Sequence, residues 1–136
     1  MGQMLKLTHE DKLLEIGTGS ASQTVEWAKS GCEVHTIELQ PVTEPWRVFT
    51  GKDQVYAHIG NGKFGLPQEA PFSAIVATCG VESIPDAWTD QLKPLGRLVV
   101  PLGNSSCQRL TLFEKDEDGR FIPQRIAGYV RFSMMR

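Results

Sequence analysis

The residues of this 136-residue chain that are best suited to chemistry form one short segment, Leu13-Leu-Glu-Ile-Gly-Thr-Gly-Ser-Ala21. An apolar run ends in the acidic Glu15, and glycines then alternate with small residues, which is typical of a strand that turns directly into a helix around a nucleotide-like ligand. Gly17 and Gly19 allow a close approach of the backbone to that ligand, because they carry no Cβ atom. We expect Thr18, between them, to line the same site. A tight strand-to-helix turn that holds no ligand is the alternative interpretation.

The spacing of the small residues distinguishes between two classes of cofactor. The segment reads Gly-x-Gly-x-Ala, and Ser22 stands where a dinucleotide-binding Gly-x-Gly-x-x-Gly motif has its last glycine. A pyrophosphate needs that longer glycine turn, whereas an uncharged or cationic ligand does not. The spacing therefore favours S-adenosylmethionine over NAD.

Two carboxylates are candidates for binding such a cofactor. Glu38 follows an apolar strand about 20 residues beyond the glycines, where ribose-binding folds place a carboxylate that accepts hydrogen bonds from both ribose hydroxyls. We expect Glu38 to bind the ribose, and we include its neighbour Leu39 in the site; a solvated surface glutamate is the alternative. Glu15 either orients the backbone of the glycine turn or contacts the amino group of the methionine part, and the sequence leaves both roles open.

A further candidate position is the end of a predicted strand, Thr78-Cys-Gly-Val81. Ligands of open α/β sheets bind beyond the carboxyl ends of the strands, so we expect Thr78 to lie where methyl donor and acceptor meet. Cys79 has no neighbouring base in the sequence and is expected to be a packing residue. His35 and His58 share no motif, and paired or exposed structural roles are expected for them. No residue is therefore assigned to catalysis.

Composition predicts one globular domain spanning residues 1–136. The net charge of −2 gives no electrostatic reason to bind nucleic acid or a membrane surface, and no apolar run approaches the roughly 20 residues of a membrane span. The three cysteines are an odd number without metal-ligand spacing, so no metal is expected. With no signal-peptide pattern at the amino terminus, a reduced, cytoplasmic compartment is the expected location.

Apolar strands alternate with helices along most of the chain, which predicts an α/β fold with helices on both faces of a sheet. The expected strands are residues 12–16, 33–39, 54–59, 72–78, 97–102, 110–115 and 129–134, and the expected helices are residues 20–30, 41–49 (or an irregular segment there) and 85–92. The last two strands follow each other through the acidic turn Asp116-Glu-Asp-Gly119. We therefore expect a mostly parallel, Rossmann-like sheet in the order 3-2-1-4-5-7-6, with strand 7 antiparallel.

Several motifs of the chain occur in a fixed order that resembles the protein-L-isoaspartate O-methyltransferases. They are Leu14-Glu-Ile-Gly-Thr-Gly-Ser-Ala21, His35-Thr-Ile-Glu38, Gly60-Asn-Gly-Lys-Phe-Gly-Leu-Pro67, Glu82-Ser-Ile-Pro85, Gln91-Leu-Lys-Pro-Leu-Gly-Arg-Leu-Val-Val-Pro-Leu-Gly103 and Tyr129-Val-Arg-Phe132. The resemblance implies a class I methyltransferase fold, S-adenosylmethionine as cofactor and protein repair as the role. It also implies that Asn61 stands where the family has an aspartate that accepts from the adenine amino group, with the Gly62 backbone at the adenine edge.

The chain departs from the family pattern in two regions. The resemblance implies a preceding segment with a Thr-Ile-Ser motif near the methyl-transfer site, and nothing in the chain matches it. The stretch between Glu38 and Val55 is shorter than in the family, so we expect a trimmed second helix. We therefore expect slow repair of isoaspartyl peptides by this chain alone, and either a homodimer that covers the cleft or a different acceptor.

Three hypotheses about function follow from these features. The first is methyl transfer from S-adenosylmethionine to a carboxylate or other oxygen of a protein or small-molecule acceptor. The second is a module that binds the cofactor or a partner without catalysis. The third, an NAD-dependent oxidoreductase, is disfavoured by the glycine spacing and by the antiparallel ending. A carboxylate acceptor needs no general base, which agrees with the scarcity of candidate bases.

Overall fold

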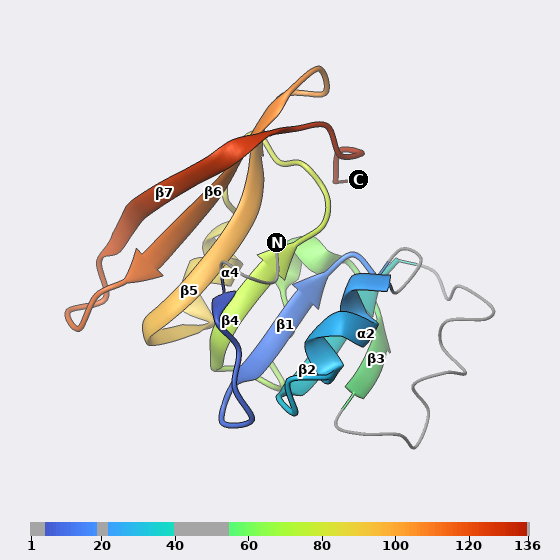
Figure 1. Cartoon of the computed structure of the whole chain (residues 1–136), viewed down its shortest axis with the longest axis vertical. Coiled ribbons are helices and arrows are strands. Elements are labelled where there is room, and N and C mark those ends of the chain that lie inside the picture. Colours follow the sequence, from blue (N-terminus) through green and yellow to red (C-terminus); the bar gives the residue numbers. More distant parts are fainter. Residues whose placement is uncertain (1–4, 19–21, 40–54, 136) are drawn as a thin grey trace.

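The computed structural model describes residues 5–18, 22–39 and 55–135. Within these residues, seven strands form one sheet in the order β3-β2-β1-β4-β5-β6-β7 (Figure 1). The strands are β1 (Lys12–Ile16), β2 (Glu33–Glu38), β3 (Val55–Ile59), β4 (Phe72–Ala77), β5 (Leu92–Gly103), β6 (Gln108–Lys115) and β7 (Phe121–Val130). The helices are α2 (Ser22–Ala28), the short 3-10 helix η1 (Gly62–Phe64) and α4 (Asp86–Asp90). The predicted α/β class is confirmed.

Strand β1 is the centre of the parallel half of the sheet. It pairs in parallel with β2 on one side and with β4 on the other, so that Leu14 lies between His35 and Ile75. Residues 13–16 are all buried, and β4 is buried almost throughout, as expected for apolar strands covered on both faces. The predictions of strands over residues 12–16, 33–39, 54–59 and 72–78 are confirmed to within one residue at each end.

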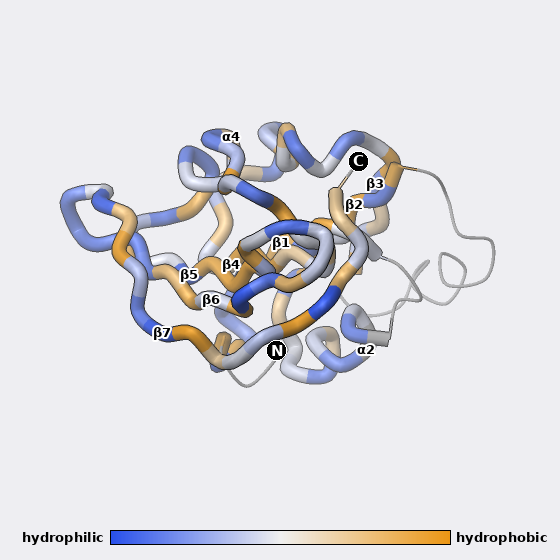
Figure 2. Tube along the Cα trace, turned by 90° about the horizontal axis from the view of Figure 1, so that it is seen from above, coloured by the Kyte–Doolittle hydropathy of each residue, from blue (hydrophilic) through white to orange (hydrophobic). Residues whose placement is uncertain are grey.

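The two faces of this sheet are covered by different helices. Trp27 of α2 packs with Leu13 and Val34 on one face, whereas Trp88 of α4 packs with Leu14 on the other. Figure 2 shows α2 and α4 on opposite sides of the strands, with the most hydrophobic segments between them. The prediction of helices on both faces is therefore confirmed.

The carboxyl-terminal part of the chain is an antiparallel addition to the sheet. Strand β6 pairs antiparallel with β5, and β7 pairs antiparallel with β6. The predicted order 3-2-1-4-5-7-6 is therefore wrong in its last two places, since β6 lies beside β5 and β7 forms the edge. The strand that runs opposite to the parallel half is accordingly β6, not strand 7 as predicted. The reason is the short connection through residues 104–107, because such a connection joins two antiparallel neighbours and leaves no room for a strand between them.

Two strand boundaries also differ from those predicted. Strand β7 spans Phe121–Val130 rather than residues 129–134. Pro123 and Gly128 are residue types that argue against a strand in the sequence, but an edge strand tolerates both. Strand β5 begins at Leu92 rather than at residue 97, and the Pro94-Leu-Gly96 segment interrupts its pairing with β4 instead of preceding the strand.

Some of the predicted features lie outside the described residues. These are Gly19 and Ala21 of the glycine motif, and the segment 41–49 with the expected trimmed second helix. Among the helices that the structure does describe, none has the length and apolar character needed to cross a membrane.

Candidate functional site

The carboxyl ends of β1, β2 and β4 are joined by backbone hydrogen bonds at one edge of the sheet. The Gly17 amide donates to the Ile37 carbonyl of β2 at 2.9 Å, and the Thr78 amide donates to the Ile16 carbonyl of β1 at 2.9 Å. Glu38 is the last residue of β2. The structure thus brings Gly17, Thr78 and Glu38 to the same edge, where open α/β sheets bind their ligands.

Two glycines at this edge leave no space for a side chain. Gly17 has φ = +94°, and a Cβ atom there would lie 2.6 Å from Oγ1 of Thr78. That hydroxyl donates to the carbonyls of both Gly17 and Ile16, so it is fixed against the turn. A Cβ atom at Gly62, in the loop after β3, would lie 2.5 Å from Cγ2 of Ile16. Glycine at both positions therefore lets two loops meet closely over the end of β1.

Glu15 is fully buried in a network of hydroxyl groups beneath α2. Its Oε1 accepts from the hydroxyls of Thr24 and Thr36, the latter at 2.6 Å. Burial raises the pKa of the Glu15 carboxyl to about 7, partly offset by the two threonine hydrogen bonds, while the charge of Glu38 raises it further. Its Oε2 is buried and has no hydrogen-bond partner among the described residues. Oε1 of Glu15 therefore stabilises the fold through two hydrogen bonds, and Oε2 is an acceptor without a partner among the described residues.

Thr18 contributes its side chain to the same network rather than to the open edge. It is buried, and its Oγ1 lies 2.6 Å from Oγ1 of Thr36. Only its backbone is therefore placed to meet a ligand.

Glu38 lies at the border between the interior and solvent. It is half-buried, and its neighbour Leu39 is 43% exposed. Burial raises the pKa of the Cys79 thiol to about 11, and the negative charge of Glu38 contributes to that increase. The charge of Glu38, the last residue of β2, thus contributes to the raised pKa of both Glu15 and Cys79.

Asn61 begins the loop that follows β3 and is exposed. Its Oδ1 accepts from the Lys63 amide at 2.9 Å and caps η1. This hydrogen bond fixes the orientation of the Asn61 amide group and leaves one lone pair of Oδ1 and the whole NH₂ group for a ligand.

Sequence reasoning missed two residues that hold this loop. The indole Nε1 of Trp88 donates to the Gly62 carbonyl at 2.7 Å, and the Gln91 side chain bonds both Phe64 and Leu66. Both lie at least 25 positions after the residues that they bond. Gln91 opens one of the motifs noted in the sequence, but nothing in that motif links it to this loop.

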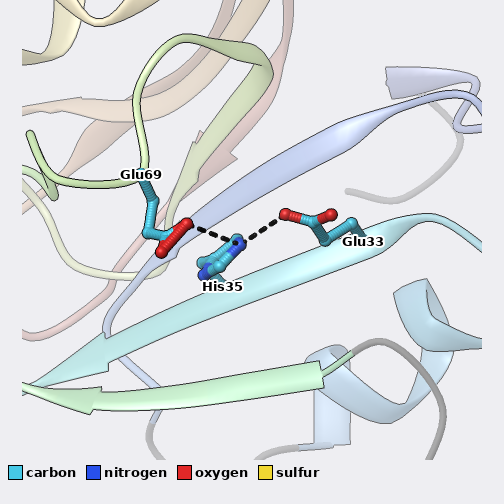
Figure 3. A group of neighbouring side chains, drawn as sticks. All are labelled: Glu33, His35 and Glu69. Atoms are coloured by element: carbon cyan, nitrogen blue, oxygen red, sulfur yellow. Dashed lines mark hydrogen bonds and ion pairs between the residues drawn. The ribbon is translucent and has the colours of Figure 1, made fainter.

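A second polar group lies at the amino ends of β2 and β4, away from the candidate site. His35 Nε2 lies 2.7 Å from Glu33 Oε2 and 3.8 Å from Glu69 Oε2 (Figure 3). The Nζ atom of Lys12 lies 3.8 Å from one oxygen of each carboxylate, so an ammonium group already offsets part of their negative charge. The arrangement is that of a structural ion-pair network.

The two predicted strand histidines are paired within this network. Nδ1 of His35 lies 3.0 Å from Nε2 of His58, which confirms the paired structural role. Burial, and then the nearby His35, lower the pKa of His58.

A sheet with this strand order, a glycine turn after β1 and a carboxylate at the end of β2 defines the class of Rossmann-like cofactor-binding proteins, and solved methyltransferases share this fold. A structure named protein-L-isoaspartate O-methyltransferase superimposes with a TM-score of 0.84 at 26% identity, covering 97% of this chain and 44% of the other. A β-aspartate methyltransferase from Plasmodium falciparum in complex with S-adenosyl-L-homocysteine gives a TM-score of 0.77 at 17% identity, covering 98% and 68% of the two chains. At that identity, the second match supports the fold alone.

The sequence assigns the chain within this class. Residues 1–134 match the family described as protein-L-isoaspartate(D-aspartate) O-methyltransferase, and the chain belongs to that family. The protein-L-isoaspartate O-methyltransferase 1 of Nitrosospira multiformis is 42% identical over 141 aligned residues, which cover all of this chain and 59% of the relative. The resemblance seen in the motifs is confirmed. The chain spans about three fifths of the length of curated relatives that it matches.

Proposed function

We propose that the chain binds S-adenosylmethionine across the carboxyl ends of β1, β2 and β4 and supports methyl transfer to a carboxylate of a protein substrate. The observation that carries the proposal is the convergence of Gly17, Thr78 and Glu38 at the carboxyl ends of three adjacent parallel strands. The missing Cβ of Gly17 lets the turn after β1 pack directly against Thr78 at this edge. Family membership supports the choice of cofactor.

The residues at this edge fit the chemical groups of that cofactor. The carboxylate of Glu38 suits the two ribose hydroxyls, because its two oxygens accept two hydrogen bonds. The unused Oε2 of Glu15 suits the amino group of the methionine part. Asn61 and the Gly62 backbone suit the edge of the adenine ring. Among the described residues, Oε1 of Glu15 bonds threonine hydroxyls and not the backbone of the glycine turn, so of the two roles that the sequence left open we propose the contact with the amino group.

The reaction requires few acid or base groups from the protein. When bound, S-adenosylmethionine supplies a methyl group that its sulfonium already activates. What remains for a methyltransferase is to hold the acceptor oxygen in line with that methyl group and to keep water away. A carboxylate acceptor is ionised at neutral pH and needs no general base. This agrees with the surroundings of Thr78, where the neighbouring Cys79 thiol stays protonated because its pKa is about 11.

A methyl-transfer assay tests the proposal. The chain is incubated with methyl-labelled S-adenosylmethionine and either an isoaspartyl peptide or the same peptide with a normal aspartyl residue. We expect label in the isoaspartyl peptide, inhibition by S-adenosylhomocysteine and loss of transfer in Glu38→Ala. The matched control is Glu117→Ala, in the exposed turn between β6 and β7. Cofactor binding without transfer to any acceptor would instead indicate a binding module, and no cofactor binding would contradict the proposal.

A further inference from the structure

The loop between β3 and β4 is held by two side chains from the region of α4. Trp88 is fully buried, and its Nε1 donates to the Gly62 carbonyl at 2.7 Å. Gln91 is 8% exposed; its Oε1 accepts from the Leu66 amide at 2.8 Å, and its Nε2 donates to the Phe64 carbonyl at 2.9 Å. Three backbone groups of this loop are therefore bonded to side chains that lie 25 to 27 positions later in the chain.

The Gln91 carboxamide has a single possible orientation in this position. The Leu66 amide can only donate and the Phe64 carbonyl can only accept, so the oxygen and nitrogen of the side chain cannot be exchanged. Its backbone is fixed as well, because its amide donates to Ala87 and its carbonyl accepts from the Phe72 amide at 2.8 Å. Gln91 is thus a rigid support that connects α4, β4 and the loop.

The contact with Gly65 shows how closely this support fits. Gly65 has φ = +62°, and a Cβ atom there would lie 2.3 Å from Oε1 of Gln91. The loop backbone therefore lies directly on the carboxamide. The shape of η1 follows from this contact, and that shape in turn places the Lys63 amide that holds Asn61 Oδ1 at 2.9 Å.

We propose that Gln91, together with Trp88, is a positioning residue that gives the Asn61–Gly65 loop its selectivity for adenine. The inference rests on the proposed function, in which Asn61 and the Gly62 backbone meet the adenine edge. Adenine presents an amino donor and a ring acceptor to an amide group, whereas hypoxanthine presents a carbonyl and a ring N–H. An amide held in one orientation distinguishes the two bases, and an amide on a loosened loop turns to suit either.

The test compares two ligands that differ only in the base. The dissociation constants of S-adenosylhomocysteine and S-inosylhomocysteine are measured by calorimetry for the parent chain, Gln91→Met and Gln91→Glu. Methionine keeps the approximate shape of Gln91 and loses both hydrogen bonds, whereas glutamate keeps the acceptor for Leu66 and loses the donor to Phe64. Trp88→Phe removes the indole donor together with part of the buried ring, and it replaces a Gln91 variant that fails to fold.

The matched control is Lys115→Met. The Lys115 ammonium donates to the carbonyls of Thr89 and Leu92 at 2.8 and 2.9 Å, so it supports the same end of α4 without contacting the loop. A general loss of stability lowers the melting temperature in the control and in the Gln91 variants alike. A change in base selectivity is expected in the Gln91 variants only.

We expect the parent chain to prefer the adenine ligand by about tenfold or more, and each Gln91 variant to lose about fivefold of that preference, since one or two hydrogen bonds no longer hold the loop. An unchanged ratio in both Gln91 variants, or an equal fall in Lys115→Met, would overturn the inference and leave the proposed function intact. Equal binding of the two ligands by the parent chain would also overturn it. A parent chain that binds neither ligand would overturn the proposed function as well.

Discussion

At the residue scale, Glu15 combines a structural role with a place in the candidate site. One carboxyl oxygen is bonded to two threonine hydroxyls, and the other has no hydrogen-bond partner within the described part of the chain. The sequence identified Glu15 as a candidate because an acid precedes the glycine turn. It could not show the hydroxyl network, because Thr24 and Thr36 come from a helix and a neighbouring strand and approach Glu15 only after folding.

The raised pKa of Glu15 predicts a pH dependence of stability. The folded pKa of about 7 exceeds the reference value of 4.5, so the folded chain holds the Glu15 proton more tightly than the unfolded chain does. The contribution of this group to stability is therefore complete below pH 4.5 and is lost as the pH rises to 7. In Glu15→Gln this loss is absent, so its free energy of unfolding should fall by about 3 kcal/mol less than that of the parent between pH 4.5 and 7.5.

Urea denaturation at several pH values in the absence of ligand measures this difference. Comparing the two proteins removes the contribution of His58, which they share and whose lowered pKa acts in the opposite direction. Parallel curves for parent and variant would show that Glu15 is ionised normally in the folded chain.

At the element scale, the turn after β1 depends on glycine for two separate reasons. Gly17 has a positive φ, and its missing Cβ makes room for Thr78. Gly119, in the turn between β6 and β7, has a similar φ of +85°, but the nearest atom to an added Cβ is Lys115 Cε at 3.8 Å. Comparing substitutions at Gly17 and Gly119 therefore distinguishes the cost of backbone strain from the cost of steric overlap.

We predict that Gly119→Ala loses about 1–2 kcal/mol of stability from strain alone, and that Gly17→Ala loses about 1–3 kcal/mol more because its Cβ overlaps the Thr78 hydroxyl. Gly17→Ala should also weaken cofactor binding, whereas Gly119→Ala should not. Chemical denaturation and ligand titration of both variants provide the comparison. Equal losses of stability in the two variants would mean that Thr78 moves away to accommodate a Cβ atom at position 17, and would contradict the predicted overlap.

Strand β7 is the element whose position the sequence predicted least well. Residues 122–127 are all exposed, so both faces of the strand meet solvent, and no alternation of apolar and polar residues marks it. The strand forms because β6 provides its hydrogen-bond partners, and this pairing between strands is not visible in the local sequence. The buried strands β1 and β4, in contrast, were predicted to within one residue because their apolar runs are a local signal.

The exposure of β7 predicts uneven protection of the backbone. Amide hydrogens of residues 121–130 should exchange with solvent much faster than those of β1 and β4, because an edge strand with few buried contacts opens locally. Hydrogen–deuterium exchange followed by mass spectrometry reports both regions in one experiment. Protection of β7 equal to that of β4 would indicate that another surface covers the edge in solution.

At the scale of the whole molecule, the candidate site depends on the sheet more than on any single motif. Gly17, Glu38 and Thr78 follow three strands that are adjacent in space, and their meeting point follows from parallel pairing, which the alternation of strands and helices predicted. The hydrogen bonds from Trp88 and Gln91 to the loop depend on how α4 packs against the face of the sheet that α2 does not cover. Sequence spacing does not predict that packing. The sequence could therefore identify the loop around Asn61 as part of the candidate site, but it could not identify Trp88 and Gln91 as the residues that hold the loop.

The reversed order of the last two strands leaves the candidate site unchanged. The exchange concerns β6 and β7, whereas the site residues follow β1, β2, β3 and β4. An error in strand order at one edge therefore does not alter the placement of the candidate site residues, because the parallel half of the sheet is specified by its own buried strands. That residues 1–136 fold as one domain stays a prediction, for which a single thermal transition is expected.

The most direct test of cofactor binding at this edge is calorimetric titration of the parent chain, Glu38→Ala and Glu117→Ala with S-adenosylhomocysteine. Removing the proposed ribose acceptor should cost about 2 kcal/mol, or about thirtyfold in affinity, the range for hydrogen bonds to a charged group. The exposed turn variant Glu117→Ala should bind like the parent. Unchanged affinity in Glu38→Ala, or no binding heat for the parent chain at millimolar ligand, would contradict the assignment of this edge as the S-adenosylmethionine site.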